Sequence, residues 1–137
     1  MRHLWQYHKD VLAIGLGLFF LNVGIMHFTD VEWFTPIVPE ILPFSAEFWV
    51  IVSGIPEVLC GLGLMLPQTR VLAGKATVVL LVVLYCANLN MWIYDIPLDG
   101  NTFPVWAHFL RLLAQLGMIA VAAYLGEWFP KYNSSEN

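Results

Sequence analysis

Four long runs of apolar residues, separated by short polar segments, dominate the chain. The runs cover about residues 11–28, 47–66, 73–94 and 105–126. Each is close to the roughly 20 residues that a helix needs to cross a hydrocarbon core of about 30 Å. Because backbone groups in lipid must be hydrogen-bonded within their own segment, these runs predict α-helices. Nothing in the pattern shows the strand-like alternation of a membrane barrel. We therefore expect an all-α fold, a bundle of four transmembrane helices.

The connection between the first two runs, residues 29–46, is unlike an ordinary loop. Its prolines prevent one continuous helix. It also carries six large apolar side chains, which a water-exposed loop would not need: Trp33, Phe34, Ile37, Ile41, Leu42 and Phe44. We expect this proline-rich segment to lie at the membrane interface and to fold back over the mouth of the bundle. The other connections, residues 67–70 and 95–104, are predicted turns.

Composition places this pattern in lipid. The 137 residues are 59% hydrophobic and 12% charged, with a mean hydropathy of +0.71. Soluble domains carry about 25% charged residues, and a soluble domain of this size could not bury so much apolar surface. The same values exclude intrinsic disorder. The length fits a single integral membrane domain, residues 1–137, with the lipid bilayer as its surroundings.

The basic residues predict an orientation. The chain holds six Lys and Arg residues and has a net charge of −4. All but Arg111 lie near the first helix start, the 67–70 turn or the chain end: Arg2, Lys9, Arg70, Lys75 and Lys131. The other two connections contain only acidic charges, so the positive-inside rule predicts that both termini are cytoplasmic. The basic residues are scattered, which argues against nucleic-acid binding.

Polar side chains inside the predicted helices are the candidates for chemistry, because ionisable groups in a membrane are costly. They come from all four helices: Asn22, His27, Ser53, Glu57, Asn88, His108, Arg111 and Gln115. At 1.5 Å per residue, Glu57 lies about 15 Å and Arg111 about 10 Å from the same end of the bundle. We therefore expect these eight residues to line a polar cavity that opens toward the outer side, beneath residues 29–46.

A purely structural interpretation of the same residues stays open. Glu57 and Arg111 would then form one ion pair that fixes the helix register, as a buried pair can. Asn88 and Gln115 would supply hydrogen bonds between helices. Polar groups on four helices exceed what helix register needs, which favours a cavity.

Three kinds of chemistry find little support. His27 and His108 could be axial haem ligands, but only their similar depth favours haem. Ser53 and His108 lack the strained turn that an activated serine usually has. Cys60 and Cys86 form no CxxC pair, and no set of carboxylates and histidines has metal-ligand spacing, so no metal site is predicted.

Several motifs resemble the DoxX-like family of small four-helix membrane proteins. The resemblance covers about residues 18–126, most of the chain. The motifs that carry it are Gly24-x-x-His27-Phe28, Ser53-Gly54-x-x-Glu57, Pro67-x-Thr69-Arg70, Ala87-Asn88 and Arg111-x-x-x-Gln115. Family members often have proline before the Ala-Asn pair and between the Arg and the Gln. This chain has Cys86 and Leu113 there, which predicts straighter third and fourth helices.

The resemblance implies a four-helix protein of a bacterial inner membrane, with two classes of function. Some relatives are membrane subunits of quinone-linked redox systems, while others are partners or assembly factors of other proteins. We expect a cavity for a small or lipid-soluble ligand, with a quinone-linked redox subunit as the leading interpretation. Arg111 would orient a polar headgroup, and Glu57 would exchange a proton. The alternative is a non-catalytic partner of another membrane or redox protein, and the sequence leaves open whether the chain is an enzyme.

Overall fold

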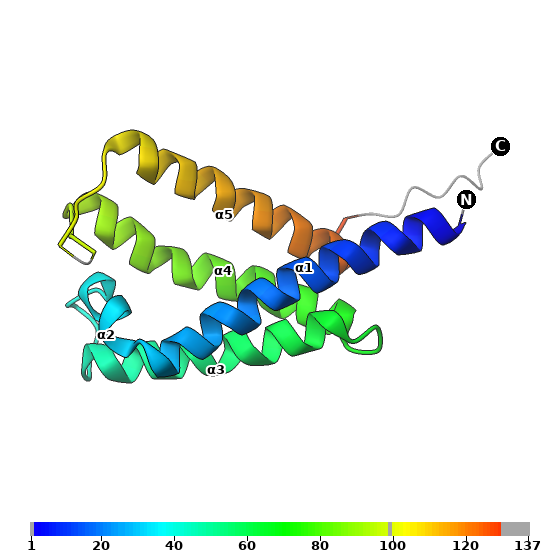
Figure 1. Cartoon of the computed structure of the whole chain (residues 1–137), viewed down its shortest axis with the longest axis horizontal. Helices are drawn as coiled ribbons and strands as arrows, with labels where there is room; N and C mark the ends of the chain where they lie inside the picture. Colours follow the sequence, from blue (N-terminus) through cyan, green and yellow to red (C-terminus); the bar gives the residue numbers. More distant parts are fainter. Residues whose placement is uncertain (1, 99, 130–137) are drawn as a thin grey trace.

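A computed structural model describes residues 2–98 and 100–129 of the chain (Figure 1). Its four long helices are α1 (Arg2–Thr29), α3 (Ala46–Met65), α4 (Arg70–Ile93) and α5 (Val105–Leu125). A short helix, α2 (Val31–Phe34), and a 3-10 turn, η1 (Thr35–Ile37), lie between α1 and α3. The four long helices are long and apolar enough to cross a membrane. The expected all-α architecture of four long apolar helices is thus confirmed. Asp99 and Lys131, whose charges contribute to the orientation predicted from the sequence, lie outside the described residues.

The largest difference from the expected bounds is at the start of α1. The apolar run begins at Val11, but α1 already begins at Arg2. Apolar periodicity marks only the part of a helix that meets lipid or protein. The polar residues before it continue the same helix, which at 1.5 Å per residue is about 42 Å long. The first helix is therefore longer than a hydrocarbon core requires.

Glycines set the distance between α1 and α3, which run antiparallel and share the most extensive contact of the fold (Figure 1). A Cβ atom on Gly61 would lie 2.7 Å from the Gly17 carbonyl oxygen, and one on Gly24 would lie 2.9 Å from the Val58 nitrogen. Larger residues at these positions would clash with the opposite backbone. The close approach of small residues is a common way for membrane helices to associate.

The second helix pair is α4 with α5, and α3 joins the two pairs through α4. An apolar core holds all four helices together, with fully buried side chains such as Phe20, Leu64 and Leu125. We call the end of the bundle where α1 begins and α5 ends the terminal end (Figure 1). Leu64 and Leu125 lie there, in the last turns of α3 and α5. The opposite end, where α2, η1 and the 94–104 connection lie, is the loop end. Contacts between α1 and α5 are few.

Residues 30–45 lie across the loop end and contact both helix pairs. The Phe34 ring stacks on the His27 ring of α1, with 4.1 Å between centroids. From α4, the Asn90 side-chain amide donates a hydrogen bond of 3.1 Å to the Ile37 carbonyl oxygen. The segment then enters α3 through Ser45, whose hydroxyl oxygen accepts from the Phe48 N–H. A serine in this position is a common helix N-cap.

Candidate functional site

The most deeply buried ionisable pair joins α1 to α3. His27 Nδ1 lies 2.9 Å from Glu57 Oε2, and the two residues are only 7% and 3% exposed. The same Nδ1 lies 2.7 Å from the Val23 carbonyl oxygen. A carbonyl can only accept, so Nδ1 carries a hydrogen in this arrangement. Glu57 Oε2 has no well-directed hydrogen bond to any described residue. The His27 imidazole, 2.9 Å away, is the polar group paired with it.

Arg111 does not pair with Glu57 in the structure. Its Nη1 lies 3.2 Å from the Met91 sulfur, and its guanidinium lies 4.6 Å from the centre of the Phe103 ring. The Glu57–Arg111 ion pair expected from depth alone is therefore replaced by a Glu57–His27 pair. The glycines between α1 and α3 explain the difference, because they bring the His27 side chain closer to Glu57 than α5 comes.

His108 lies one turn before Arg111 on the same face of α5. It is 4% exposed and stacks on the Trp92 ring, with 5.6 Å between centroids and planes within 10°. The Phe103 ring meets it edge-on at 6.2 Å. Its Nε2 is buried without a hydrogen-bond partner among residues 2–98 and 100–129. Buried polar atoms are nearly always bonded, so this atom requires an explanation.

Gln115 occupies the next turns of this face of α5. Its buried side-chain amide donates a hydrogen bond of 2.7 Å to the Leu81 carbonyl oxygen of α4. The bond fixes the register of α5 against α4, which is the structural role considered for it above. Asn88 is half-buried on α4, near the end of the helix that carries Trp92.

The two remaining candidates make only local contacts. The Ser53 hydroxyl donates to the Val50 carbonyl oxygen on its own helix at 2.9 Å. The Asn22 amide is exposed and lies 4.0 Å from the Met26 sulfur on its own helix. The structure thus arranges the predicted residues as two clusters, His27 with Glu57 between α1 and α3, and His108 with Arg111 on the α4–α5 pair.

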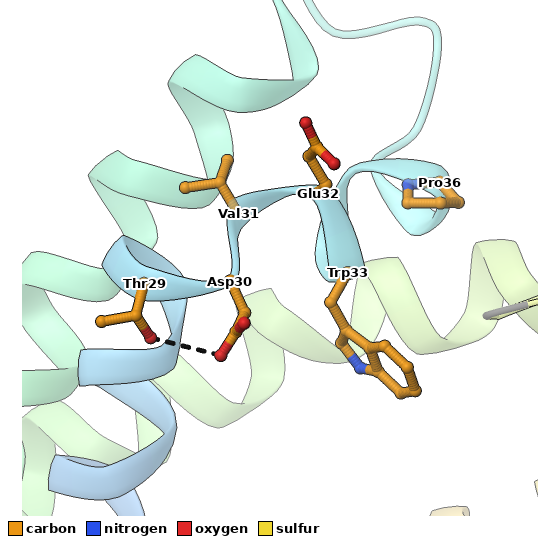
Figure 2. Close-up of a pocket in the computed structure, with 6 residues that line it drawn as sticks. All are labelled: Thr29, Asp30, Val31, Glu32, Trp33 and Pro36. Atoms are coloured by element: carbon orange, nitrogen blue, oxygen red, sulfur yellow. Dashed lines mark hydrogen bonds between the residues drawn. The ribbon is translucent and has the colours of Figure 1, made fainter.

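Open space lies at the loop end, around residues 29–41. One pocket of about 590 Å³ is lined by residues 29–33 and Pro36. Figure 2 shows the side chains of Glu32 and Trp33 pointing in opposite directions from the ribbon, while Asp30 accepts a hydrogen bond from the Thr29 hydroxyl. A second pocket of about 410 Å³ lies between residues 36–41 and the end of α4, and Asn90 lines it.

A further ion pair, between buried Arg70 and the partly exposed Asp10, lies at the terminal end and was not predicted from the sequence. Arg70 is 7% exposed. Its Nη1 donates to Asp10 Oδ1 at 2.7 Å, and its Nε donates to the Leu64 carbonyl oxygen at 3.0 Å. It therefore links α4 to α1 and α3. Asp10 is the one acidic residue among the first ten, and this isolated charge was the signal available in the sequence.

Four apolar helices with ionisable side chains inside them define a small multi-pass membrane protein. The chain belongs to the family of the domain of unknown function DUF8561, whose model matches residues 16–126. The match runs from α1 to the end of α5, so it includes both polar clusters. No curated protein and no solved structure matches the chain.

Proposed function

We propose that this chain is a bacterial inner-membrane protein that binds a lipid-soluble ligand of the quinone type at the loop end of its bundle. The observation that carries the proposal is the state of Arg111 and His108. Within the described part of the chain no acidic side chain pairs with Arg111, and His108 Nε2 has no partner. Both side chains belong to a helix that can span the membrane.

An arginine within a spanning helix costs about 2.5–3.5 kcal/mol on insertion scales. A chain that uses Arg111 only for packing would do better with an apolar residue. Intramembrane ionisable residues face cavities or substrate pathways as a rule. Arg111 therefore supports a binding role more than a structural one, and its planar guanidinium donates hydrogen bonds in a fixed geometry.

A quinone headgroup suits this set of donors. Its two carbonyl oxygens accept hydrogen bonds, for which Arg111 supplies N–H donors and His108 Nε2 supplies a donor when it is protonated. Its flat ring can stack on aromatic side chains such as Trp92 and Phe103. Its apolar tail would lie in the lipid along α5. Because Trp92 and Phe103 cover His108 in this structure, entry of the ring requires at least one of them to change rotamer.

The His27–Glu57 pair supports the second half of the proposal. A carboxyl and an imidazole 2.9 Å apart can exchange a proton within the membrane, and quinone chemistry consumes or releases protons. We propose that this pair exchanges protons with the site, in a protein that serves a redox system as a quinone-linked subunit. The relationship to the DoxX-like family stays a prediction that rests on the quoted motifs.

We further propose that both termini are cytoplasmic, so that the loop end faces outward. The distribution of Lys and Arg supports this orientation. Residues 30–45 would then lie at the outward-facing surface of the inner membrane. Exposed aromatic side chains such as Trp33 and Phe44 are favourable at such an interface. In that position the segment covers the outer mouth of the bundle.

The test uses the purified protein in lipid nanodiscs and a short-chain benzoquinone as the probe. We expect saturable quenching of tryptophan fluorescence by the wild type, and at least tenfold weaker binding by Arg111→Gln. Leu110→Ala is the matched control, because Leu110 is the preceding residue and its side chain faces outward, 54% exposed. Equal binding by Arg111→Gln and the wild type would contradict the proposal. Absence of saturable binding would favour the alternative, a non-catalytic partner or assembly factor of another membrane protein.

A further inference from the structure

Asn22 is one of the candidate residues that the proposed ligand site does not use. It is exposed, and it lies about 200° around α1 from Phe20, at 100° per residue. Phe20 is 2% exposed and belongs to the core, and His27 and Gly24 share its side of the helix. The Asn22 amide therefore points away from the other helices of the chain. Figure 1 shows α1 crossing in front of α3 and α4, with one side free of other helices.

This outward face of α1 continues above and below Asn22. Gly15, Leu18 and Ile25 recur at steps of three and four residues from it, and all are exposed. A Cβ atom on Gly15 would have nothing within 4 Å, so no contact within the chain requires a glycine there. Steps of three and four produce the seam through which paired helices pack.

The amide lies at hydrocarbon depth. Asn22 is seven residues from Thr29, the last residue of α1, which places it about 10 Å inside that end. The only hydrogen-bond contact offered to it by the described residues is the Met26 sulfur at 4.0 Å, a weak acceptor. Its carbonyl oxygen and its amide hydrogens would face lipid tails, which cannot hydrogen-bond.

We propose that the face of α1 formed by Gly15, Leu18, Asn22 and Ile25 is the interface of a homodimer. Two copies inserted in the same orientation present α1 as parallel helices related by a two-fold axis along the membrane normal. Residue 22 then meets residue 22 of the second copy. An asparagine amide both donates and accepts, so it is complementary to itself across such an axis.

A second copy is favoured over a different helix because one amide completes the pair without any further polar residue. Gly15, one heptad earlier, leaves room for the two backbones to approach, as small residues do in membrane dimers. A single asparagine at such a seam also fixes the register of paired helices. The ligand-binding proposal involves His27, Glu57 and the α5 face, so the two proposals fail independently.

Disulfide cross-linking in native membranes tests the position of the interface. In a Cys60→Ala, Cys86→Ala background, Leu18→Cys should form a disulfide-linked dimer under mild oxidation. Leu113→Cys on α5 is the matched control, because Leu18 and Leu113 are similarly exposed, at 53% and 49%. Cross-linking through Leu18→Cys alone supports the dimer. No cross-linking, or equal cross-linking at both positions, overturns it.

Dimer dissociation in detergent tests the role of the amide. Asn22→Leu should weaken the dimer roughly tenfold, whereas Asn22→Gln should retain most of the affinity. Gly15→Leu should prevent dimerisation, while Gly117→Leu should not, although both glycines have open space around them in the monomer. The mass by analytical ultracentrifugation should be twice 15.5 kDa for the wild type. A wild-type monomer, or an Asn22→Leu dimer of unchanged affinity, overturns the proposal.

Discussion

His27 and Glu57 face each other across the α1–α3 interface, with 2.9 Å between Nδ1 and Oε2. The carboxylate buried in α3 is thus paired with a neighbour from the preceding long helix and not with the arginine of α5. This arrangement separates the ionisable residues among the predicted candidates into two clusters, His27 with Glu57 and His108 with Arg111. Each cluster can be altered without touching the other, which makes their roles experimentally separable.

Removing His27 should destabilise the protein, because Glu57 would lose its nearby partner. Breaking a buried pair from one side costs about 3–5 kcal/mol. We expect a loss near the lower end of this range for His27→Leu in a bicelle unfolding assay. The double variant His27→Leu, Glu57→Gln should lose less than the sum of the two single losses, since both remove the same interaction.

The contrasting pair of variants is Glu57→Gln with Arg111→Met. These residues share no contact in the structure, so their losses should add within about 0.5 kcal/mol. Strong coupling between Glu57 and Arg111, with additive losses for Glu57 and His27, would show that Glu57 pairs with Arg111 and not with His27. The measurement is the same unfolding assay.

Gly61→Ala should destabilise the bundle by about 1–3 kcal/mol, the usual cost of overpacking. The added methyl group would lie 2.7 Å from the Gly17 carbonyl oxygen, and a backbone atom cannot move away alone. Gly117→Ala is the control, because its Cβ would meet nothing within 4 Å. The control should be neutral or up to about 1 kcal/mol stabilising, from helix propensity. Equal effects of the two substitutions on unfolding would show that α1 and α3 are further apart.

Arg70→Met should lower the free energy of unfolding by about 1.5–3 kcal/mol, the range for hydrogen bonds of a charged group. It removes the bonds to both Asp10 and the Leu64 carbonyl oxygen. Lys9→Met is the control at the same end, since its ion pair with Glu127 is 4.0 Å long and partly exposed. Such pairs contribute less than about 1 kcal/mol. A larger effect from Lys9 would place the main link between helices elsewhere.

The orientation is tested by reporter fusions at the connections between helices. A fusion after Gln68 should report the cytoplasm, and one after Gly100 should report the outer side. The expectation follows from the positions of Lys and Arg. The opposite pattern would turn the proposed binding site toward the cytoplasm and leave the two clusters themselves unchanged.

Asn90→Ala should release residues 30–45 from α4, because it removes the hydrogen bond to the Ile37 carbonyl oxygen. A cysteine at Ile37, which is half-buried, should then react faster with a water-soluble thiol reagent than it does beside Asn90. A cysteine at Ile41, which is 91% exposed, should react at the same rate in both backgrounds. No change at Ile37 would show that the segment is held by other contacts.

The number of long helices could be predicted from the sequence, because lipid makes apolar runs of about 20 residues diagnostic. The start of α1 could not, because its first residues are polar. The depth estimated for Glu57 and Arg111 rests on helix rise alone and stays a prediction. The partners could not be predicted, because depth fixes only one coordinate. Whether Glu57 meets His27 or Arg111 depends on which helices approach most closely, and Gly17 and Gly61 decide that through backbone contacts.

Asn22 and Arg70 illustrate two further limits of sequence reasoning. Helix periodicity places Asn22 opposite Phe20, but only the packing shows which of these two faces is buried. Arg70 looks like an ordinary basic residue beside a turn. Its partner is an aspartate sixty positions earlier in the chain. The isolated charge of Asp10 is visible in the sequence, but nothing near Arg70 shows that the two residues pair.

The link between Asn90 and Ile37 uses a main-chain oxygen as its acceptor. Every residue type carries that oxygen, so replacing the Ile37 side chain leaves the acceptor in place. Residues 30–45 can therefore diverge in sequence while keeping their number and their attachment to α4. Insertions or deletions between Thr29 and Ser45 should be far more damaging than substitutions, because they shift the carbonyl out of reach of the amide.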